Sequence, residues 1–340
     1  MGITIKVGIV TAPKIEFEQR EHTFILKNVR IGIGFHWDRT EDQEFAGTLT
    51  IRNNADGTQT AINTIDLEDY LCSVISSEMN ANSPMELLKA HAVISRSWAI
   101  RAMEHPNHEG FDVCADDHCQ RYEGLRRINE RAVEAVRATT GQVLLYGDEI
   151  CDCRYYKCCG GRTEIWRTCW EDIDVPYIQS VECPYCSKAV HRTSFLRTFL
   201  NDYDQETTDF RDWNVTYTAE ELNEIVREKS GIDFGTITDL IPLKRGASGR
   251  IYELKIVGTK HTEIIGKELK IRLWLSRSCL YSSWFEVTHK DGQWTLAGHG
   301  WGHGAGLCQI GAAVMASEGK TYEEILRYYY AGARLSTPTR

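Results

Sequence analysis

Glu78 is the side chain in this sequence with the clearest potential for acid catalysis. Leu67, Leu71 and Val74 recur at three- and four-residue steps after Asp66, a suitable helix N-cap, and Glu78 continues the same stripe if the helix runs one more turn. A carboxyl group on an apolar face loses hydration, which disfavours its charged form and raises its pKa, as a general acid requires. If the helix ends earlier, Glu78 is an ordinary terminal residue.

A second group of side chains has the composition of a metal site. Residues 105–119 contain several imidazoles and thiols, and the ligand set we favour is His108, Cys114, His118 and Cys119. Four protein ligands would complete a tetrahedral shell, so we expect a structural zinc ion that braces a loop rather than activates water. The alternative is a set of unrelated thiols and imidazoles.

Cysteine is abundant, with twelve residues, seven of which fall between Cys151 and Cys186. Cys183-Pro-Tyr-Cys186 has the spacing of a glutaredoxin-type pair, which makes a thiol-disulfide oxidoreductase a remote alternative function. Such a pair normally opens a helix after a strand near the start of a small domain, whereas this one lies mid-chain. A metal clip or a structural disulfide is therefore favoured. A second metal centre is conceivable, but the sequence does not choose between metal, disulfide and free thiols or name the ligands.

The elements that position these groups are of mixed type. Short alternating apolar and polar runs predict an antiparallel β-rich layer over residues 1–61. Helical periodicity begins at Asp66, and Ser83-Pro84-Met85-Glu86 has the pattern of a capping box with proline at the first helical position. Thr218–Glu221 and Thr321–Glu324 have the same kind of helix start. We therefore expect an α+β fold with a mixed helix and antiparallel-sheet core over residues 62–335, which is either separate from residues 1–61 or interwoven with them. A strand-rich subdomain over residues 190–297 is expected within that core.

Composition excludes several classes of protein. The 39 basic and 48 acidic residues give a formal charge of −9, which argues against a nucleic-acid-binding protein. A content of 42% hydrophobic residues fits a packed globular chain, and no apolar run is long enough for a transmembrane helix. The first residues lack the apolar core of a signal peptide, so we expect either a cytoplasmic protein or one whose export segment is absent from this sequence.

Several blocks along the chain resemble the SpoIID/LytB family of stage II sporulation D proteins and amidase enhancers. They occur in order over residues 62–335 and include Asp66–Leu71, Ser77-Glu78-Met79, Leu87–Trp98, Cys159–Thr163, Pro176-Tyr177, Gly300–Gly304, Gln309–Ala312 and Tyr322–Leu326. Two positions depart from the family pattern, because Asn80 stands where many relatives have proline and Cys308 where serine is usual.

The resemblance implies a lytic transglycosylase of peptidoglycan that cuts glycan strands, preferentially those stripped of stem peptides, and forms 1,6-anhydromuramic acid. It marks Glu78 as the acid that later serves as base, and it implies zinc in the loop of residues 108–119. It also places near the substrate the residues Lys89, Arg96, Thr163 and Tyr177, and it makes the loop that carries Trp301 and His303 one wall of the active region. A non-catalytic glycan-binding protein that enhances a cell-wall amidase is the alternative. The resemblance implies a location in the cell envelope, and it leaves the biological process, the oligomeric state and the preferred glycan length open.

The glycine-rich segment Gly298–Gly306 has glycine at every second position, which lets the backbone approach another group closely. Its spacing differs from that of a dinucleotide-binding loop, and it lacks the ending of a P-loop. Trp301 in this segment could stack on a sugar, and His303 could bond either glycan or another loop. A purely structural turn is the alternative.

Overall fold

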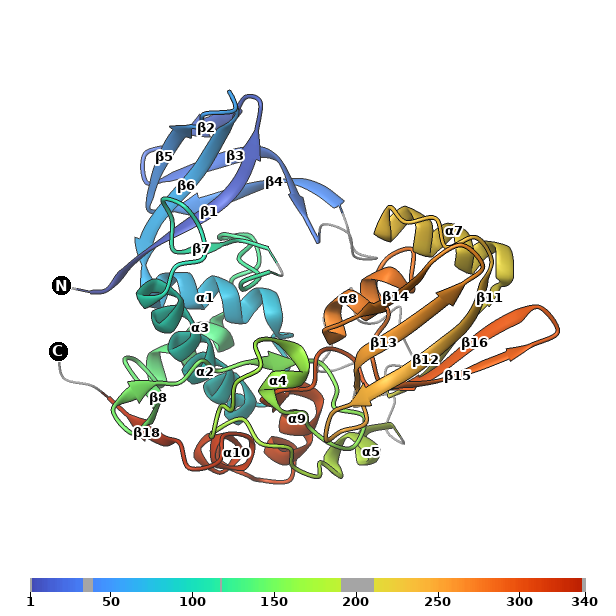
Figure 1. Ribbon diagram of the computed structural model, residues 1–340. Coiled ribbons are helices and arrows are strands. Elements are labelled where there is room, and N and C mark those ends of the chain that lie inside the picture. The colour runs from blue at the N-terminus through green and yellow to red at the C-terminus, as the bar shows by residue number, and fades with distance from the viewer. Residues whose placement is uncertain (1, 33–38, 117, 191–210, 338–340) are drawn as a thin grey trace.

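The computed structural model describes residues 2–32, 39–116, 118–190 and 211–337 (Figure 1). Helices are combined with sheets whose strand pairs are mostly antiparallel, so the predicted α+β fold is confirmed. Two short parallel pairs are exceptions, β1 with β7 and β10 with β17. Both exceptions help to position the candidate site.

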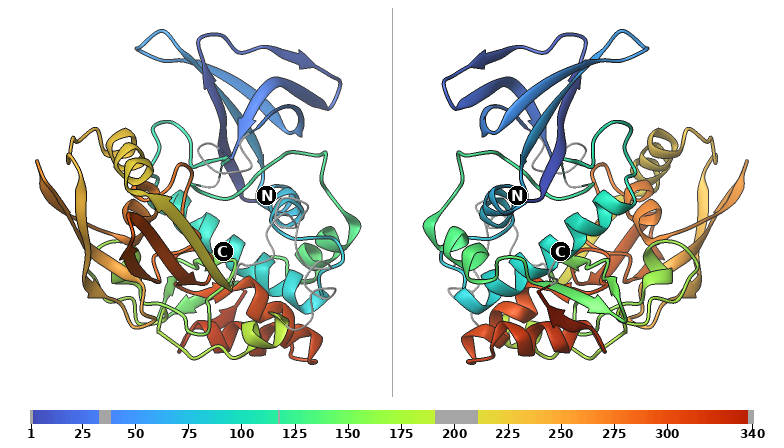
Figure 2. Two further views of the ribbon diagram at one scale, coloured as in Figure 1. Left: turned by 90° about the vertical axis from the view of Figure 1, so that its right-hand side faces the viewer. Right: turned by 90° about the vertical axis from the view of Figure 1, so that its left-hand side faces the viewer.

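The N-terminal strands form two sheets that stand above the helices in the views of Figures 1 and 2. Buried side chains such as Val7, Phe24 and Phe45 pack into the same hydrophobic core as those helices. The strand orders are β5-β6-β1-β7 and β2-β3-β4. The strands are β1 (Thr4–Ala12), β2 (Phe17–Gln19), β3 (Thr23–Ile31), β4 (Arg39–Ala46), β5 (Thr48–Asn53), β6 (Gln59–Asp66) and β7 (Val113–Cys114).

The helical part begins directly after β6. Asp66 caps α1 by accepting a hydrogen bond from the Glu68 N–H at 2.9 Å, as predicted. The helices of this part are α1 (Leu67–Glu78), α2 (Met85–Glu104), α3 (Glu130–Ala138), α4 (Trp166–Cys169), α5 (Tyr185–Val190), α9 (Gln309–Ser317) and α10 (Tyr322–Tyr329). Short strands connect them: β8 (Val143–Tyr146), β9 (Glu149–Ile150), β10 (Tyr155–Tyr156), β17 (Leu307–Cys308) and β18 (Arg334–Ser336). Among the helices of the described residues, none combines the length and the apolar character needed to cross a bilayer.

The predicted capping box at the start of α2 is wrong. Pro84 is the N-cap, and the buried Ser83 hydroxyl has no hydrogen-bond partner in the described part of the chain. Glu86 does not reach back to Ser83 because its carboxylate accepts hydrogen bonds from the Tyr322 N–H at 2.8 Å and from Lys89 Nζ at 2.7 Å. A contact with α10 thus replaces the local cap, whereas α10 itself and α7 begin with the expected capping boxes.

A second hydrophobic core lies between residues 213 and 296 and is built around Trp213, Leu254 and Phe285. Its strands form the sheets β11-β16-β15 and β12-β13-β14. Most of the strand-rich segment expected at 190–297 falls here, while residues 191–210 lie outside the described part. The elements are β11 (Asp212–Thr218), α7 (Ala219–Ser230), β12 (Ile237–Arg245), β13 (Ile251–Gly258), β14 (Thr262–Ile265), α8 (Glu268–Trp274), β15 (Phe285–Lys290) and β16 (Gln293–His299).

Buried polar contacts join the two cores. The Glu164 carboxylate, fully buried, accepts hydrogen bonds from the backbone N–H groups of Ala247 and Ser248 at 3.0 Å and from the Ser248 hydroxyl at 2.6 Å. Arg250, also fully buried, donates to the carbonyl of Gly302 at 3.2 Å and to the Ser248 hydroxyl at 3.0 Å. We call these contacts the seam. Buried polar groups need partners, and the bonds from Ala247 and Ser248 to Glu164 and from Arg250 to Gly302 run between the two cores, while Ser248 and Arg250 belong to the same core.

Replacing Arg250 tests the seam. In Arg250→Met, the Gly302 carbonyl and the Ser248 hydroxyl lose a charged donor in a buried place, so we expect the free energy of unfolding to fall by about 2–4 kcal/mol. Urea unfolding followed by tryptophan fluorescence measures the change. Arg227→Met, an exposed substitution on α7, is the control and should change stability by less than about 0.5 kcal/mol. Equal effects of the two substitutions would contradict the role given to Arg250.

Candidate functional site

A cavity of about 560 Å³ lies between the two cores. Its walls come from the end of α1, from α2, from the loop over residues 107–121, from β10, from α4 and α8, and from the glycine-rich segment. Glu78, Trp301 and His303 all line it, so three residues singled out from the sequence meet in one place. The volume is within the range of small-molecule binding sites.

Glu78 is the last residue of α1, and its half-buried carboxylate lines the cavity. The helix ends before Asn80 and Glu78 is a terminal residue, as in the alternative interpretation of the sequence. Its side chain still reaches the cavity. Oε1 accepts hydrogen bonds from the Arg121 backbone N–H and from the Tyr155 hydroxyl, each at 3.2 Å. Two segments distant in the sequence therefore fix the orientation of one carboxylate oxygen.

Tyr155 is held in place by two histidines. The His303 Nε2–H donates to the Tyr155 carbonyl at 3.0 Å, and the His91 ring lies edge-on to the Tyr155 ring with centroids 4.4 Å apart. Burial raises the pKa of Tyr155 well above its ordinary value, and the negative charge of Glu78 adds to this shift. The phenol therefore stays protonated and keeps its role as a donor.

His91 is a fully buried, uncharged residue. Its Nε2 lies 3.1 Å from Gln309 Nε2, and its Nδ1 lies 3.2 Å from Ser95 Oγ. Burial lowers the pKa of His91 to about 3, and the charge of Lys157 contributes to the same shift. Because the Gln309 amide nitrogen can only donate, Nε2 accepts and the ring proton is assigned to Nδ1.

An aromatic wall surrounds Arg154. The Arg154 guanidinium lies 4.7 Å from the ring centroid of Trp170, 5.3 Å from that of Trp166 and 5.7 Å from that of Trp98. Asp152 pairs with it at 2.7 Å. Trp98, Trp166 and Trp170 also line the cavity, so this wall is aromatic and carries a cation that is paired with Asp152.

The other carboxylates that line the cavity have protein partners. Asp112 accepts a hydrogen bond from the Lys6 N–H at 2.7 Å, Glu171 accepts one from Trp166 Nε1 at 3.1 Å, and Glu268 pairs with Arg272 at 3.4 Å. Each of these contacts ties the carboxylate to its own wall of the cavity.

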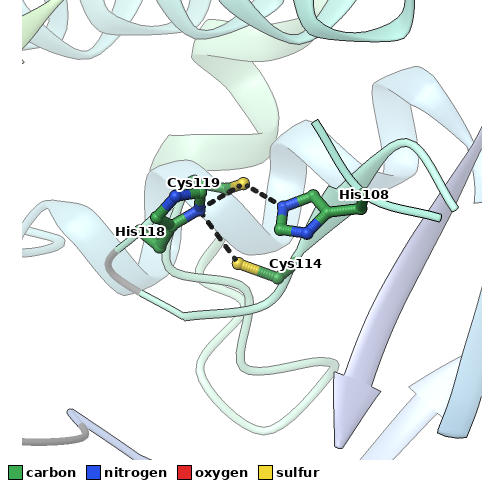
Figure 3. A group of neighbouring side chains, drawn as sticks. All are labelled: His108, Cys114, His118 and Cys119. Carbon is green, nitrogen blue, oxygen red and sulfur yellow. Dashed lines mark hydrogen bonds between the residues drawn. The ribbon is translucent and has the colours of Figure 1, made fainter. Parts of the chain in front are cut away.

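The four predicted metal ligands come together, and three of them, His108, His118 and Cys119, also line the cavity (Figure 3). All four ligand atoms lie within 4.8 Å of one another. His108 Nε2 is 3.2 Å from Cys119 Sγ, and His118 Nδ1 is 3.5 Å from the same sulfur and 3.9 Å from Cys114 Sγ. These separations suit donors placed around one tetrahedral ion.

The chemistry of these four residues favours a cation. A hydrogen bond from Cys119, with a further one from His118, lowers the pKa of the Cys114 thiol, although burial opposes the shift. A thiolate is the form that binds metals. Cys114 lies on β7, where it pairs with Gly8 of β1, so one ligand is anchored to the N-terminal sheet.

The loop that carries this cluster also supplies a donor to the candidate acid. Cys119 and His118 lie just before Arg121, whose N–H binds Glu78. Gln120, which is buried, donates to the Ser95 carbonyl on α2 at 3.4 Å and accepts from Tyr70 at 3.2 Å. The possible metal cluster and the Glu78 site are therefore parts of one connected structure.

Comparison with known proteins agrees with this geometry. The sequence profile described as Stage II sporulation protein matches residues 55–146, which contain α1, α2 and the metal loop. An uncharacterized protein of Brachyspira hyodysenteriae is 31% identical over 85% of this chain and 71% of its own length. The Stage II sporulation protein D of Bacillus subtilis is 25% identical over 81% of this chain and 76% of its own length. The chain belongs to the SpoIID family.

Two further matches complete the comparison of this SpoIID-family protein. A domain of unknown function, DUF8618, matches residues 164–306, a range that contains the second core. The amidase enhancer of Bacillus subtilis is 25% identical over 78% of this chain, but the match covers 40% of that longer protein. The two family models together therefore cover elements of both walls of the cavity.

Four predicted substrate-binding residues of the SpoIID-family chain do not line the cavity. Arg96 is buried and forms a bidentate ion pair with Glu68, with contacts of 2.8 and 2.6 Å. Lys89 contacts Glu86 and lies 5.8 Å from the ring centroid of Tyr322. The structure places both cations in the packing of the helices.

Thr163 and Tyr177 hold loops rather than face the cavity. The Thr163 hydroxyl accepts from the Val181 N–H at 2.8 Å and donates to the Gln179 carbonyl at 3.1 Å. The Tyr177 hydroxyl accepts from the Asp152 N–H at 2.9 Å, and Asp152 pairs with Arg154 of the aromatic wall. Their contribution to the site is therefore indirect.

Tyr155, His91 and Arg154 were not predicted from the sequence of this SpoIID-family protein. A lone tyrosine or arginine among cysteines carries no spacing signal that distinguishes it from a structural residue. His91 is part of the Leu87–Trp98 block, and that block was the only signal that could have drawn attention to it. The contacts of these residues are long-range, since Tyr155 and Glu78 are 77 positions apart.

The pKa of His91 predicts a pH dependence of stability. Because the folded pKa of about 3 lies below the unfolded value of 6.5, the unfolded state binds more protons between these limits, and stability falls as the pH falls from 6.5 toward 3. At pH 5 the loss from this residue should be about 2 kcal/mol. Urea unfolding at pH 7 and pH 5 should show a smaller difference for His91→Gln than for the unsubstituted protein, and an identical difference would contradict the prediction.

Proposed function

We propose that this protein is a peptidoglycan lytic transglycosylase with Glu78 as its catalytic acid and base. The observation that carries the proposal is the position of Glu78, whose carboxylate lines a large cavity and is oriented by the Tyr155 hydroxyl and the Arg121 N–H. Family membership supports a role in the cell wall, because the relatives include a Stage II sporulation protein D and an amidase enhancer.

The proposed reaction uses one proton and consumes no water. Glu78 in its acid form donates a proton to the glycosidic oxygen between MurNAc and GlcNAc, and the bond from C1 to that oxygen breaks. The C6 hydroxyl of the same muramic residue then bonds to C1, and the Glu78 carboxylate takes the hydroxyl proton. The product is a 1,6-anhydro sugar and the acid is regenerated. An internal nucleophile makes a second carboxylate unnecessary, unlike hydrolysis by paired carboxylates.

The walls of the cavity suit a glycan stripped of stem peptides. Trp98, Trp170 and Trp301 line the cavity, and aromatic rings are suited to packing against the apolar faces of sugars. Removal of a stem peptide leaves a carboxylate on the lactyl group of muramic acid. Arg121 and Lys157 line the cavity and supply positive charge for such a group.

We propose zinc as the ion held by His108, Cys114, His118 and Cys119. Two imidazoles and two thiols form a set that zinc prefers, and all four donors come from protein. The role in this proposal is structural. The ligands brace residues 108–119, and the next residues carry the N–H that binds Glu78.

A non-catalytic glycan-binding protein is the second candidate function. It is favoured by the relative named as an amidase enhancer, and it would use the same cavity without cleaving a bond. A cell-wall amidase would then be the partner. Under either function the substrate or ligand is peptidoglycan, so we propose the cell envelope as the place of action.

Substitution of Glu78 separates the two candidates. Denuded glycan strands incubated with the unsubstituted protein should yield fragments ending in anhydromuramic acid, detected by mass spectrometry. In Glu78→Gln the general acid is lost, and we expect at least a 100-fold lower rate with glycan binding retained. Glu134→Gln, an exposed substitution of the same type on α3, is the matched control and should cleave normally. Binding without fragments from the unsubstituted protein would favour the enhancer.

Removal of the metal cluster tests the structural role of zinc. Cys114→Ser combined with Cys119→Ser should lower the zinc content by one ion per chain, because two of four ligands are lost. We expect the cleavage rate to fall at least tenfold, since the loop that bears the Arg121 N–H loses its brace. Elemental analysis and the fragment assay measure the two effects. Cys72→Ser, a buried cysteine of α1 outside the cluster, should change neither, and an unaltered zinc content in the double variant would refute the ligand assignment.

A further inference from the structure

Four buried cysteines outside the cavity form a second cluster of thiols. They are Cys159, Cys183, Cys186 and Cys308, with between 0% and 1% of their surface exposed. All four sulfur atoms lie within 4.8 Å of one another. Cys186 Sγ is 3.0 Å from that of Cys159, 3.2 Å from that of Cys308 and 3.9 Å from that of Cys183. Three segments far apart in the sequence therefore converge on one point.

The spacing of the sulfurs matches a single tetrahedral ion. Zinc bound by four thiolates at about 2.3 Å places those sulfurs roughly 3.8 Å apart. An iron–sulfur cluster needs a wider cage, because iron and sulfide atoms lie between the cysteines. Cys183 and Cys186 have the two-residue spacing common in zinc sites, while the other two ligands come from the turn before Gly160 and from the start of α9.

Hydrogen-bond donors around the cluster favour the thiolate form. The backbone N–H groups of Gly311 and Cys159 donate to Cys308 Sγ at 3.3 Å, and the Gly161 N–H donates to Cys159 Sγ at 3.3 Å. The Tyr329 hydroxyl lies 3.3 Å from Cys183 Sγ. Donors of this kind stabilise negative sulfur and orient metal ligands.

A glycine makes room for this arrangement. A Cβ atom at Gly311 would lie 2.8 Å from Cys183 Sγ and 2.3 Å from the Tyr329 hydroxyl. Only a residue without a side chain therefore allows α9 to approach the sulfurs so closely. Cys308 is the N-cap of this helix, and the positive end of the helix dipole favours a thiolate there.

Disulfides and a redox pair explain the cluster less well. All twelve cysteines have free thiols, and the sulfur separations given above exceed the length of a disulfide bond. A reactive pair needs an accessible thiolate, whereas Cys183 and Cys186 are buried among two further thiols. The remote alternative of a thiol-disulfide oxidoreductase therefore loses its main support.

We propose that Cys159, Cys183, Cys186 and Cys308 bind a second zinc ion in a closed, structural site. Cys308 belongs to β17, whose partner strand β10 carries Tyr155, and Gln309 after it contacts His91. The ion would thus fix β17 and the start of α9, whose contacts with β10 and with His91 orient the Tyr155 hydroxyl. This proposal does not depend on the reaction at Glu78.

Counting metal in the intact protein tests the second site. Native mass spectrometry of the unsubstituted chain, purified under reducing conditions without chelators, should show two zinc ions. Cys183→Ser combined with Cys186→Ser should lose one ion and keep the ion of the His108 cluster, whereas Cys72→Ser should keep both. Two ligands are replaced together because Cys158, also buried, adjoins the cluster and could substitute for one of them. Retention of both ions in the double variant would overturn the assignment.

A second measurement covers the case in which the double variant does not fold. Cobalt exchanged into Cys114→Ser/Cys119→Ser, which keeps the four-cysteine cluster alone, should give the intense visible bands of tetrahedral cobalt and the near-ultraviolet absorption of thiolate ligands. Absence of both signals overturns the proposal, as does alkylation of all four thiols in the metal-loaded native protein. A mass lower by the hydrogen atoms lost in disulfide formation would show that the cysteines are oxidised instead.

Discussion

The hydrogen bonds from the Tyr155 hydroxyl and the Arg121 N–H to one oxygen of Glu78 are the contacts on which the site depends. Neither donor belongs to the helix that carries Glu78, so these two hydrogen bonds form only if a loop and a strand from elsewhere in the chain are correctly placed. The structure secures each of them separately. The loop follows a cluster of metal-binding type, and the strand is fixed by His303, by the His91 ring and by its pairing with β17.

Polar groups that are buried and satisfied do much of this positioning. His91 and His303 are both kept neutral, because burial lowers the pKa of each below its ordinary value. Neutral imidazole can accept and donate at once, so each ring links two partners. A glycine lets the glycine-rich segment approach another buried polar group. A Cβ at Gly304 would lie 2.6 Å from the Arg250 guanidinium carbon. The glycine has a φ of +90°, a conformation that glycine adopts easily.

The sequence was sufficient for the parts of the protein that depend on local rules. The N-cap at Asp66, the capping boxes of α7 and α10 and the mixed fold class follow from neighbouring residues, and the four ligands of the His108 cluster were suggested by their composition. The capping box at Ser83 failed because Glu86 binds α10, a contact 236 positions away. Arg96 and Thr163 bind other parts of the protein, and Tyr155 was not predicted, for the same reason. Periodicity shows which face a residue occupies, but not which distant element covers that face.

The seam gives the cavity a property that neither core has alone. One wall carries Glu78 and the other carries α8, and the two walls belong to separately packed hydrophobic clusters. The relative placement of the two walls therefore depends on the contacts of Glu164 and Arg250 that join the cores. A polymer lying across the cavity would contact residues of both cores at once. The affinity for such a polymer would therefore depend on how the two cores are placed relative to each other.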